Sequence, residues 1–357
     1  MTASAPSSIC IFRLSALGDV THVVPVVRRL RAAWPRVPIT WIVGKVEHKL
    51  VGDLPDVEFI PFDKRAGWSG IRALRAALGG RKFGVLLHMQ LSLRANFLAA
   101  LVRAERRIGY DRERSKELHG LVVEERIRHR PRQHVLDALG SFVEPLGLEP
   151  GEPRWDIPIP DDAEAFAQEH LPGDQRTLVI SPCSSRRWRN WSAERYAAVA
   201  DHAVQRHGFR VLLCGGRSAL EQETGEAIIR AMRTPVTNLI GKDTFKQMLA
   251  VLRRASVVLS PDTGPMHCAN AVGTTVVGVH AATASWRSGP YSDRRYCVDR
   301  FEEAAMRFKG RLPADLRWGE RVELPGAMDL VTVDDVVAAF DRYVADAEGP
   351  GAPVSER

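Results

Sequence analysis

The chain has 357 residues, of which 45% are hydrophobic, and a formal net charge of +7 at pH 7. This length predicts two domains of ordinary size, each with a substantial core. No apolar run approaches the ~18 residues of a membrane helix, and the N-terminus lacks the charged-then-apolar order of a signal peptide, so we expect a cytoplasmic protein. Five scattered cysteines, odd in number, argue against a zinc site or a disulfide framework.

Basic residues gather between Arg103 and Arg132. Such a cluster fits nucleic acid, anionic lipid headgroups or a phosphorylated substrate, and it is also typical of a solvated protein face. The sequence contains no helix-turn-helix, zinc-finger or aromatic ribonucleoprotein pattern, which argues against nucleic acid as a partner.

Strands and helices alternate along the first part of the chain. Apolar runs predict buried strands at residues 9–14, 39–43, 57–62 and 85–88, with helical patterns between them, such as residues 23–34 and 71–78. This alternation predicts a parallel sheet covered by helices on both faces. Proline-rich segments at residues 149–153 and 157–160 indicate an interdomain linker.

The same pattern returns after the linker, with strands predicted at residues 177–181, 210–214, 257–259 and 275–280 and helices at 193–207 and 220–232. Within residues 291–330, a helical composition at 301–310 precedes a loop at 311–326, and we assign this segment no role. We predict an α/β chain with two Rossmann-like domains, residues 1–155 and 156–332, whose parallel sheets face each other across a cleft. Residues 333–357 add a helix and tail, for which packing on the N-terminal domain is one option.

The most informative segment is residues 260–267, SPDTGPMH, which follows a predicted strand. Pro265 is tolerated in the first turn of a helix, so the segment predicts a strand, a tight turn and a helix N-terminus. Gly264 permits close approach of a ligand, Asp262 and His267 flank it, and the helix N–H groups favour a bound phosphate. Alternatively, this is an ordinary strand-helix joint with Asp262 as the helix cap.

A second informative segment is residues 13–22, RLSALGDVTH, directly after the first predicted strand. Gly18 suits close approach of a ligand, and Asp19 is placed where a carboxylate takes a proton from an attacking hydroxyl. Alternatively, Asp19 caps a helix beginning near Val20. Neither a dinucleotide-binding G-x-G-x-x-G nor a Walker A loop is present.

Two further segments favour a nucleotide diphosphate. Residues 181–192, SPCSSRRWRNWS, combine hydroxyl and guanidinium groups that grip phosphates, although part of the segment also reads as a helix start. Residues 214–217, CGGR, precede Glu221 and Glu223, either of which is suited to receive ribose hydroxyls. The two glycines equally suit a simple tight turn.

Residues after the fourth predicted strand are candidates for binding an anionic acceptor. They comprise the segment His88 to Arg94, which includes Gln90, and the downstream cations Arg112, Arg114 and Lys116. A lone histidine is more often structural than catalytic, so His88 ranks below Asp19 as a catalytic candidate.

In their order along the chain, these segments resemble glycosyltransferase family 9, the bacterial lipopolysaccharide heptosyltransferases, and within it those that act first on the inner core. The matching pieces are residues 14–22, Gln90, residues 189–191 and residues 262–267, and residues 289–291 are similar to the tail of the family's donor site. The resemblance implies a GT-B fold with an N-terminal acceptor domain and a C-terminal donor domain. It also implies inverting, metal-independent transfer of heptose from ADP-heptose to the Kdo/inner-core region of lipopolysaccharide.

The resemblance gives roles to individual residues, with Asp19 as the general base. Arg189 replaces the family's usual lysine, Ser184 and Ser185 replace threonines, and the choice of Glu221 over Glu223 stays open. Donor-binding residues are expected to be Ser184, Ser185, Arg189, Glu221, Asp262, Thr263, Gly264 and His267. Acceptor-binding residues are expected to be Ser15, Gly18, His22, Gln90, Arg94 and Lys116.

Since the sequence has no acidic metal-ligand cluster, Arg189 and the amides after Gly264 are expected to stabilise the leaving diphosphate without a metal or cofactor. A single carboxylate suits inversion. The expected partners are a nucleotide sugar and an anionic lipid A/Kdo-type acceptor, reached by a monomer in peripheral contact with the inner face of the cytoplasmic membrane. Two alternatives are transfer from a UDP- or GDP-linked sugar and a non-catalytic basic protein that binds nucleic acid or lipid.

Overall fold

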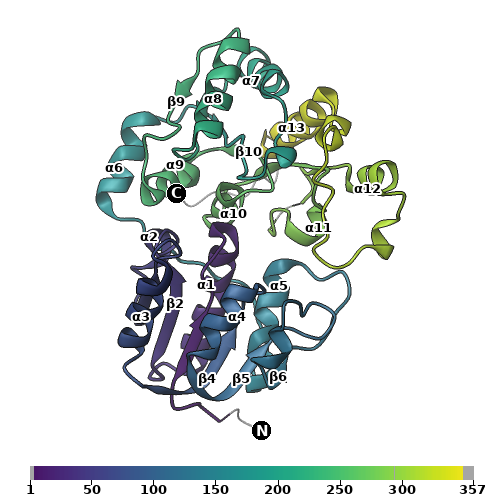
Figure 1. The fold of residues 1–357 in the computed structure, drawn as a ribbon. Helices are drawn as coiled ribbons and strands as arrows, with labels where there is room; N and C mark the ends of the chain where they lie inside the picture. The colour runs from purple at the N-terminus through teal and green to yellow at the C-terminus, as the bar shows by residue number, and fades with distance from the viewer. Residues whose placement is uncertain (1–3, 293, 349–357) are drawn as a thin grey trace. The chain divides into compact units, whose positions relative to one another are not determined.

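The computed structural model describes residues 4–292 and 294–348. The chain divides into two compact units, Met1–Pro158 and Ile159–Arg357, close to the predicted boundary between residues 155 and 156. Each unit is built on its own six-stranded sheet, in which every strand pair is parallel, and the predicted α/β class is confirmed (Figure 1).

The first unit begins with strand β1 and winds outward in both directions from it. Its sheet has the order β3-β2-β1-β4-β5-β6. The strands are β1 (Ile9–Phe12), β2 (Ile39–Gly44), β3 (Val57–Phe62), β4 (Lys82–His88), β5 (Arg103–Gly109) and β6 (Glu125–Arg126). The helices are α1 (Leu17–Ala33), α2 (His48–Val51), α3 (Gly67–Leu78), α4 (Leu93–Ala100) and α5 (Val135–Gly140).

Helices α3 and α4 pack on one face of this sheet, where Phe12, Leu74 and Leu98 share a buried cluster. Helix α1 contacts α5. Because β1 pairs with both β2 and β4, the chain reverses its winding direction between β1 and β4. Open parallel sheets bind ligands at such a switch point, beside the carboxyl ends of the two strands.

The second unit repeats this topology, since its sheet order, β12-β11-β10-β7-β8-β9, is that of the first unit read from the other edge. Its switch point lies between β7 and β10. The strands are β7 (Thr177–Ile180), β8 (Arg210–Leu213), β9 (Thr237–Asn238), β10 (Val257–Pro261), β11 (Val276–His280) and β12 (Val298–Asp299). The helices are α6 (Asp161–His170), α7 (Ala193–His207), α8 (Ala219–Ala231), α9 (Phe245–Arg254), α10 (Gly264–Ala271), α11 (Ser285–Ser288), α12 (Phe301–Lys309) and α13 (Val333–Glu348).

Helix α13 belongs to the core of the second unit. It packs on α7, β11 and β12, and its Phe340 is fully buried against Phe209. The apolar face of this helix completes the hydrophobic core of the second unit, so of the two units it belongs to the second. The rest of the predicted tail, residues 349–357, lies outside the described residues.

Strand β5 was missed because five of its seven residues, RAERRIG, are charged or glycine. Two of its arginines are held within the unit. Arg106 forms two 2.7 Å hydrogen bonds with the Glu125 carboxylate, and Arg107 donates to the carbonyls of Ala99, Val102 and Val122. The basic cluster between residues 103 and 132 is thus partly internal and not a continuous solvated face.

All five cysteines are free, and four of them are buried. Burial raises the pKa of Cys183 to about 11 and that of Cys268 to about 12, so these thiols stay protonated near neutral pH. Within the part of the chain that the structure describes, no helix has the length and apolar content needed to cross a membrane.

Candidate functional site

Predicted site residues gather at the switch point of each unit, and each unit has its own group. In the first unit most of them follow β1 and β4, with Lys116 after β5, and in the second most follow β7 and β10, with Glu221 after β8. The apolar runs that predict these strands therefore locate the polar segments that follow them.

Asp19 lies in the first turn of α1, which begins at Leu17 and not near Val20. Its side chain is 32% exposed. The Oδ2 atom accepts a hydrogen bond from the backbone N–H of Ala16 at 3.2 Å and forms an ion pair with the guanidinium group of Arg13. The N-cap position is Ala16, so Asp19 is not the N-cap of a helix beginning near Val20, although its carboxylate accepts the N–H of that N-cap residue. The carboxylate is also held beside a cation and is partly open to solvent.

Gln90 links the ends of β1 and β4. Its Oε1 accepts the N–H of Leu14 at 2.7 Å, and its Nε2 donates to Ser15 Oγ at 3.3 Å. Arg13, which pairs with Asp19, also donates to the carbonyl of Met89. Three of the predicted residues, Ser15, Asp19 and Gln90, are thus brought together at this switch point.

Gly18 and His22, which were also predicted to bind the acceptor, lie inside the first unit. Gly18 is buried, and its carbonyl accepts a 2.6 Å hydrogen bond from Thr21 Oγ1. His22 is 1% exposed, with its ring centroid 5.8 Å from that of His134. The structure does not bring the His22 ring to the surface that carries Ser15 and Asp19.

His88 is a buried structural residue. Burial, helped by the neighbouring His119, lowers the pKa of His88 to about 3, and burial lowers that of His119 to about 4. The N–H of Tyr110 donates to His119 Nε2 at 3.0 Å, so the His119 proton is on Nδ1 and is donated to Asn96 Oδ1. His88 Nε2 lies 2.8 Å from the same oxygen. Two neutral rings therefore fix Asn96, and His88 has no exposed edge for an acceptor.

Arg94 and Lys116 are exposed on segments that follow β4 and β5. Arg94 donates to the carbonyl of Lys64 at 3.4 Å. The two segments are joined because the N–H of Leu93 donates to the carboxylate of Glu117. Both predicted cations therefore lie on the same linked set of segments, Arg94 four residues after Gln90 and Lys116 after the next strand.

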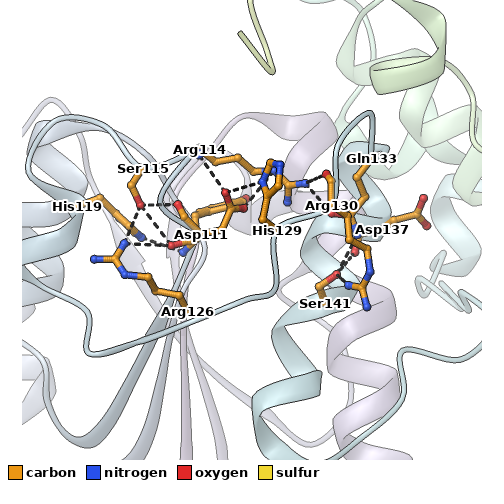
Figure 2. Close-up of polar contacts among 11 residues, drawn as sticks. Asp111, Arg114, Ser115, His119, Arg126, His129, Arg130, Gln133, Asp137 and Ser141 are labelled. Carbon is orange, nitrogen blue, oxygen red and sulfur yellow. Dashed lines mark hydrogen bonds and ion pairs between the residues drawn. The ribbon is translucent and has the colours of Figure 1, made fainter. Parts of the chain in front are cut away.

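A polar network holds the loop that follows β5, as Figure 2 shows. Asp111 accepts the N–H of Arg114 at 3.1 Å and pairs with the side chains of Arg114 and His129 at 3.3 and 3.1 Å. Arg114 also donates to Gln133 Oε1 at 2.7 Å. Since the Arg114 side chain is fully buried, its charge holds the loop, whereas Arg112 is exposed.

In the second unit, Asp262 is buried at the end of β10. Ser288 Oγ donates to its Oδ2 at 2.9 Å, and His267 Nε2 lies 3.5 Å from its Oδ1. Burial raises the pKa of Asp262, but the hydrogen bond and charge of His267, with the nearby Arg287 and His280, outweigh burial and hold the pKa well below its usual range. An ionised Asp262 thus orients His267.

The predicted strand, turn and helix start at residues 260–267 are confirmed. Helix α10 begins at Gly264 with Pro265 in its first turn. The helix cap is Thr263, whose Oγ1 accepts the N–H of Met266 at 3.3 Å, so the interpretation of Asp262 as the cap is wrong. Thr263 Oγ1 is itself held 2.9 Å from Ser260 Oγ. The start of α10 is suited to an anion, as helix N-termini are.

In the loop after β7, some residues predicted to bind the donor substrate instead form hydrogen bonds within the protein. Ser184 donates its hydroxyl to the carbonyl of Arg186 at 2.9 Å and its N–H to Asn190 Oδ1 at 2.7 Å. Arg189 Nε donates to Glu323 Oε1 at 2.6 Å, and Glu323 comes from the segment to which no role was assigned. Ser185 is exposed, as are Arg186 and Arg187, which the sequence did not single out.

Glu221 faces the turn that follows β8. Its Oε1 accepts the N–H of Gly216 and its Oε2 accepts the hydroxyl of Ser218, both at 2.6 Å, while Ser218 caps α8 by accepting the N–H of Glu221. Glu223 is exposed farther along α8. Of the two acidic candidates, Glu221 is therefore the one that contacts the glycine turn.

Asp243 is a residue near this turn that sequence reasoning missed. Burial raises its pKa to about 7, against the opposing charge of Arg217, and Glu221 raises it further. The segment is tied to the turn because the N–H of Gly241 donates to the carbonyl of Gly215 at 2.9 Å. No local motif marks Asp243, since tertiary packing alone brings it there.

Within residues 4–292 and 294–348, one group of three side chains has the spacing to hold a metal ion: His202, His207 and Asp341, on α7 and α13. Both His Nε2 atoms lie 2.7 Å from Asp341 Oδ1, which is a hydrogen-bond distance. None of the three is a predicted donor or acceptor residue.

Comparisons with known proteins lead to one enzyme family. The profile of glycosyltransferase family 9 (heptosyltransferase) matches residues 71–314. A lipopolysaccharide core heptosyltransferase, OpsX, of Haemophilus influenzae is 37% identical over 95% of this chain and 97% of its own length. A lipopolysaccharide heptosyltransferase 3 of Escherichia coli is 22% identical over 94% of this chain and 97% of its own.

Solved structures share the fold. A family 9 glycosyl transferase from Veillonella parvula has a TM-score of 0.78 at 21% identity, covering 95% of this chain and 97% of its own. The E. coli heptosyltransferase WaaC, solved with ADP, has a TM-score of 0.71 at 20% identity, covering 94% of this chain and 99% of its own. The fold is therefore that of the GT-B heptosyltransferases.

Proposed function

Because the chain belongs to glycosyltransferase family 9 and is therefore a glycosyltransferase, we propose that it transfers heptose from ADP-heptose to the Kdo/inner-core region of lipopolysaccharide. The choice of acceptor is supported by the 37% identical relative, which is a lipopolysaccharide core heptosyltransferase. The donor is bound by the second unit and the acceptor by the first.

The donor diphosphate lies, in this proposal, at the start of α10. When ADP leaves, negative charge develops on its phosphates, and donors that are already oriented stabilise that charge most effectively. The N-terminus of α10 after Thr263, His267 oriented by Asp262, and the exposed Arg186 and Arg187 supply such groups. Arg189 contributes less than the sequence indicates, because its charge is matched by Glu323.

We assign the ribose to the glycine turn after β8, beside Glu221. Its carboxylate already accepts the N–H of Gly216 and the hydroxyl of Ser218, and each oxygen retains a further lone pair for a ribose hydroxyl. The nearby Asp243, with its pKa of about 7, is neutral or charged according to pH at this place.

Asp19 is the general base of the proposed reaction. The contacts described above use its Oδ2, so we assign Oδ1 to the acceptor hydroxyl. That hydroxyl gives its proton to Asp19 while its oxygen bonds to the anomeric carbon, and the bond between that carbon and the ADP phosphate oxygen breaks with inversion. The observation that carries the proposal is this exposed carboxylate, held by Arg13 and Ala16 beside Ser15 and Gln90.

The remaining parts of the proposal concern conditions and partners. We propose that transfer needs no metal and no cofactor, that the protein acts as a monomer, and that it works in the cytoplasm in peripheral contact with the inner membrane face, where a lipid-linked acceptor is exposed. If transfer needs no metal, its rate should be unchanged in EDTA and should not rise when Mg²⁺ is added.

The direct test is a transfer assay with ADP-heptose and Kdo-containing lipid A, with the product identified by mass. We expect a heptose to be added, and no addition would overturn the proposal. Thermal unfolding with ADP, UDP and GDP at equal concentration tests the nucleotide, because a ligand that binds the native state raises its stability. The largest rise is expected with ADP, whereas a larger rise with UDP or GDP would reassign the donor.

A further inference from the structure

The large apolar side chains that the first unit exposes are concentrated at one edge of its sheet. Among the described residues of this unit, they all lie in segments that follow the carboxyl ends of β2, β3, β4 and β5. The carboxyl ends of parallel strands share one edge, so these side chains share it too. They are Val46, Trp68, Leu93, Phe97, Leu118 and Leu121.

Hydrogen bonds join these segments into a continuous surface. Lys64, after β3, donates to Glu47, after β2, at 2.6 Å, and the Lys64 carbonyl accepts from Arg94 at the start of α4. Asn96 Nδ2 donates to the carbonyl of Glu117 at 2.6 Å, and the Glu117 carboxylate accepts the N–H of Leu93. The chain of contacts thus runs from the end of β2 to the loop after β5.

The exposure of these side chains is built into the local structure. Leu93 and Phe97 are four residues apart on α4, so they lie on the same face, while Ala95, Leu98 and Ala99 of the same helix are buried. Trp68 is 76% exposed in the first turn of α3, and Leu121 is 80% exposed. The core of the unit is therefore complete without them.

The loop after β5 presents its apolar residues from a fixed base. Ser115 and His119, both within the network of Figure 2, bracket Lys116, Glu117 and Leu118. Glu117 and Leu118 have φ angles of 53° and 65°, in the left-handed region that residues other than glycine seldom adopt. The anchored network thus holds Leu118 outward in a conformation that is locally unfavourable.

Exposed cations lie among these apolar side chains. Lys45 neighbours Val46, Arg65 precedes Trp68, Arg94 lies between Leu93 and Phe97, and Lys116 precedes Leu118; all four cations are exposed. Asp63 pairs with Lys45 at 3.2 Å and Glu47 pairs with Lys64, so the positive charge offered to lipid rests mainly on Arg65, Arg94 and Lys116. Leucine and aromatic side chains mixed with lysine and arginine are typical of surfaces that bind anionic membranes.

We propose that this apolar–basic edge, formed by residues 45–46, 64–68, 93–97 and 116–121, docks the protein on an anionic lipid bilayer. The apolar side chains enter the headgroup layer, and the cations contact lipid phosphates. The biological role of this docking rests on the proposed function. The same edge carries Ser15, Asp19 and Gln90, and docking brings them to a lipid-linked acceptor.

The test uses the full chain and vesicles that contain no acceptor, without ADP-heptose, so it does not depend on the proposed transfer reaction. Sedimentation with vesicles of phosphatidylcholine and phosphatidylglycerol is expected to carry the protein down, more weakly as salt rises, and vesicles of phosphatidylcholine alone are expected to bind it poorly. The double variant Leu93→Ser with Phe97→Ser should lower the affinity by about 10- to 100-fold. The matched control, Ile229→Ser, removes an exposed apolar side chain of the second unit and should bind as the wild type does.

A second measurement locates the contact. Brominated lipid should quench part of the tryptophan fluorescence, and Trp68→Phe should remove that part. The double variant should keep wild-type thermal unfolding and wild-type transfer to a delipidated soluble acceptor, while transfer to a vesicle-embedded acceptor falls. If transfer fails with every acceptor but vesicle binding behaves as described, the proposed function is wrong and the docking surface stands.

Three results would overturn the docking proposal. The first is a wild-type protein that does not bind the anionic vesicles, and the second is a double variant that binds them as tightly as the wild type. The third is a wild-type protein that self-associates in light scattering and a double variant that does not, which would assign the edge to a second copy of the chain.

Discussion

The two units have the same strand order, but the carboxylates at their switch points differ in exposure and in partners. Asp19 is 32% exposed and is held by Arg13 and the N–H of Ala16, whereas Asp262 is 9% exposed and is held by Ser288 and His267. One topology therefore presents an acidic group in two ways. Exposure leaves Asp19 open to a substrate, and burial among donors restricts Asp262 to orienting its neighbours.

The largest expected effect is on turnover. Asp19→Asn keeps the shape of the side chain and the contact with Ala16 but removes the base, so kcat should fall by about 10²- to 10⁴-fold while ADP binding is unchanged. Transfer rates and calorimetric titration with ADP measure the two quantities. Glu113→Gln, at an exposed acid of the same unit, is the control and should keep wild-type turnover. Near-normal turnover in Asp19→Asn would remove Asp19 from the mechanism.

The second prediction concerns the buried carboxylate. Asp262→Asn should lower the free energy of unfolding by about 2 kcal/mol and weaken ADP binding by about 10-fold, because His267 loses its charged partner. Ser288→Ala, which removes one hydrogen bond to the same carboxylate, should cost about 1 kcal/mol. Denaturant unfolding and calorimetry measure both. If Asp262→Asn instead lowers turnover at saturating donor and leaves ADP affinity unchanged, the orienting role is contradicted. Asp262 would then act in the reaction step, as is proposed for Asp19.

Asp243 provides a pH-dependent test of burial in the second unit. Its pKa in the folded protein is raised to about 7, so folding favours the protonated form. The resulting stability is fully present below the pKa of the unfolded chain, near 4, and is lost as the pH rises toward about 7. Asp243→Asn removes this loss, so between pH 4 and pH 7.5 its free energy of unfolding should fall by about 4 kcal/mol less than that of the wild type, measured by denaturant unfolding at each pH. An equal pH dependence in both proteins would count against the raised pKa.

The smallest expected effect separates the two acidic candidates for the ribose. Glu221→Gln should cost about 0.5 to 1 kcal/mol of stability and weaken ADP binding by about 3- to 10-fold, because the Gly216 and Ser218 contacts lose a charged acceptor. Glu223→Gln, at an exposed position on the same helix, should change neither quantity. Weaker ADP binding in Glu223→Gln alone would reverse the assignment.

The segments of the site were predictable from sequence, but the contacts inside them were not. Apolar runs locate β1, β7 and β10, and turn residues follow each of them, so Asp19 and Asp262 are found from local pattern alone. Ser288 and Glu323 reach Asp262 and Arg189 only through tertiary packing, and neither pairing leaves a local signal. His22 was placed with the acceptor because its neighbours in sequence are there, yet its position on α1 turns it inward.

The basic composition of the first unit likewise did not predict which of its cations are exposed. Arg106, Arg107 and Arg114 contribute to a basic composition, but pairing and burial use them within the fold. The exposed apolar residues, which composition does not reveal, depend on which strand ends share an edge. Net charge is known from the sequence, but whether a given cation is buried or exposed can be predicted only when the topology is known.

The sheets share no strand among the residues that the structure describes, since β1 to β6 form one and β7 to β12 the other. Cutting the chain between Pro158 and Ile159 would leave both hydrogen-bond ladders whole. The two halves are therefore candidates for separate production and for mixing in the test tube. Under the proposed assignment of the donor to the second unit, exchanging that unit among relatives should change which sugar is transferred while the acceptor-binding unit is retained.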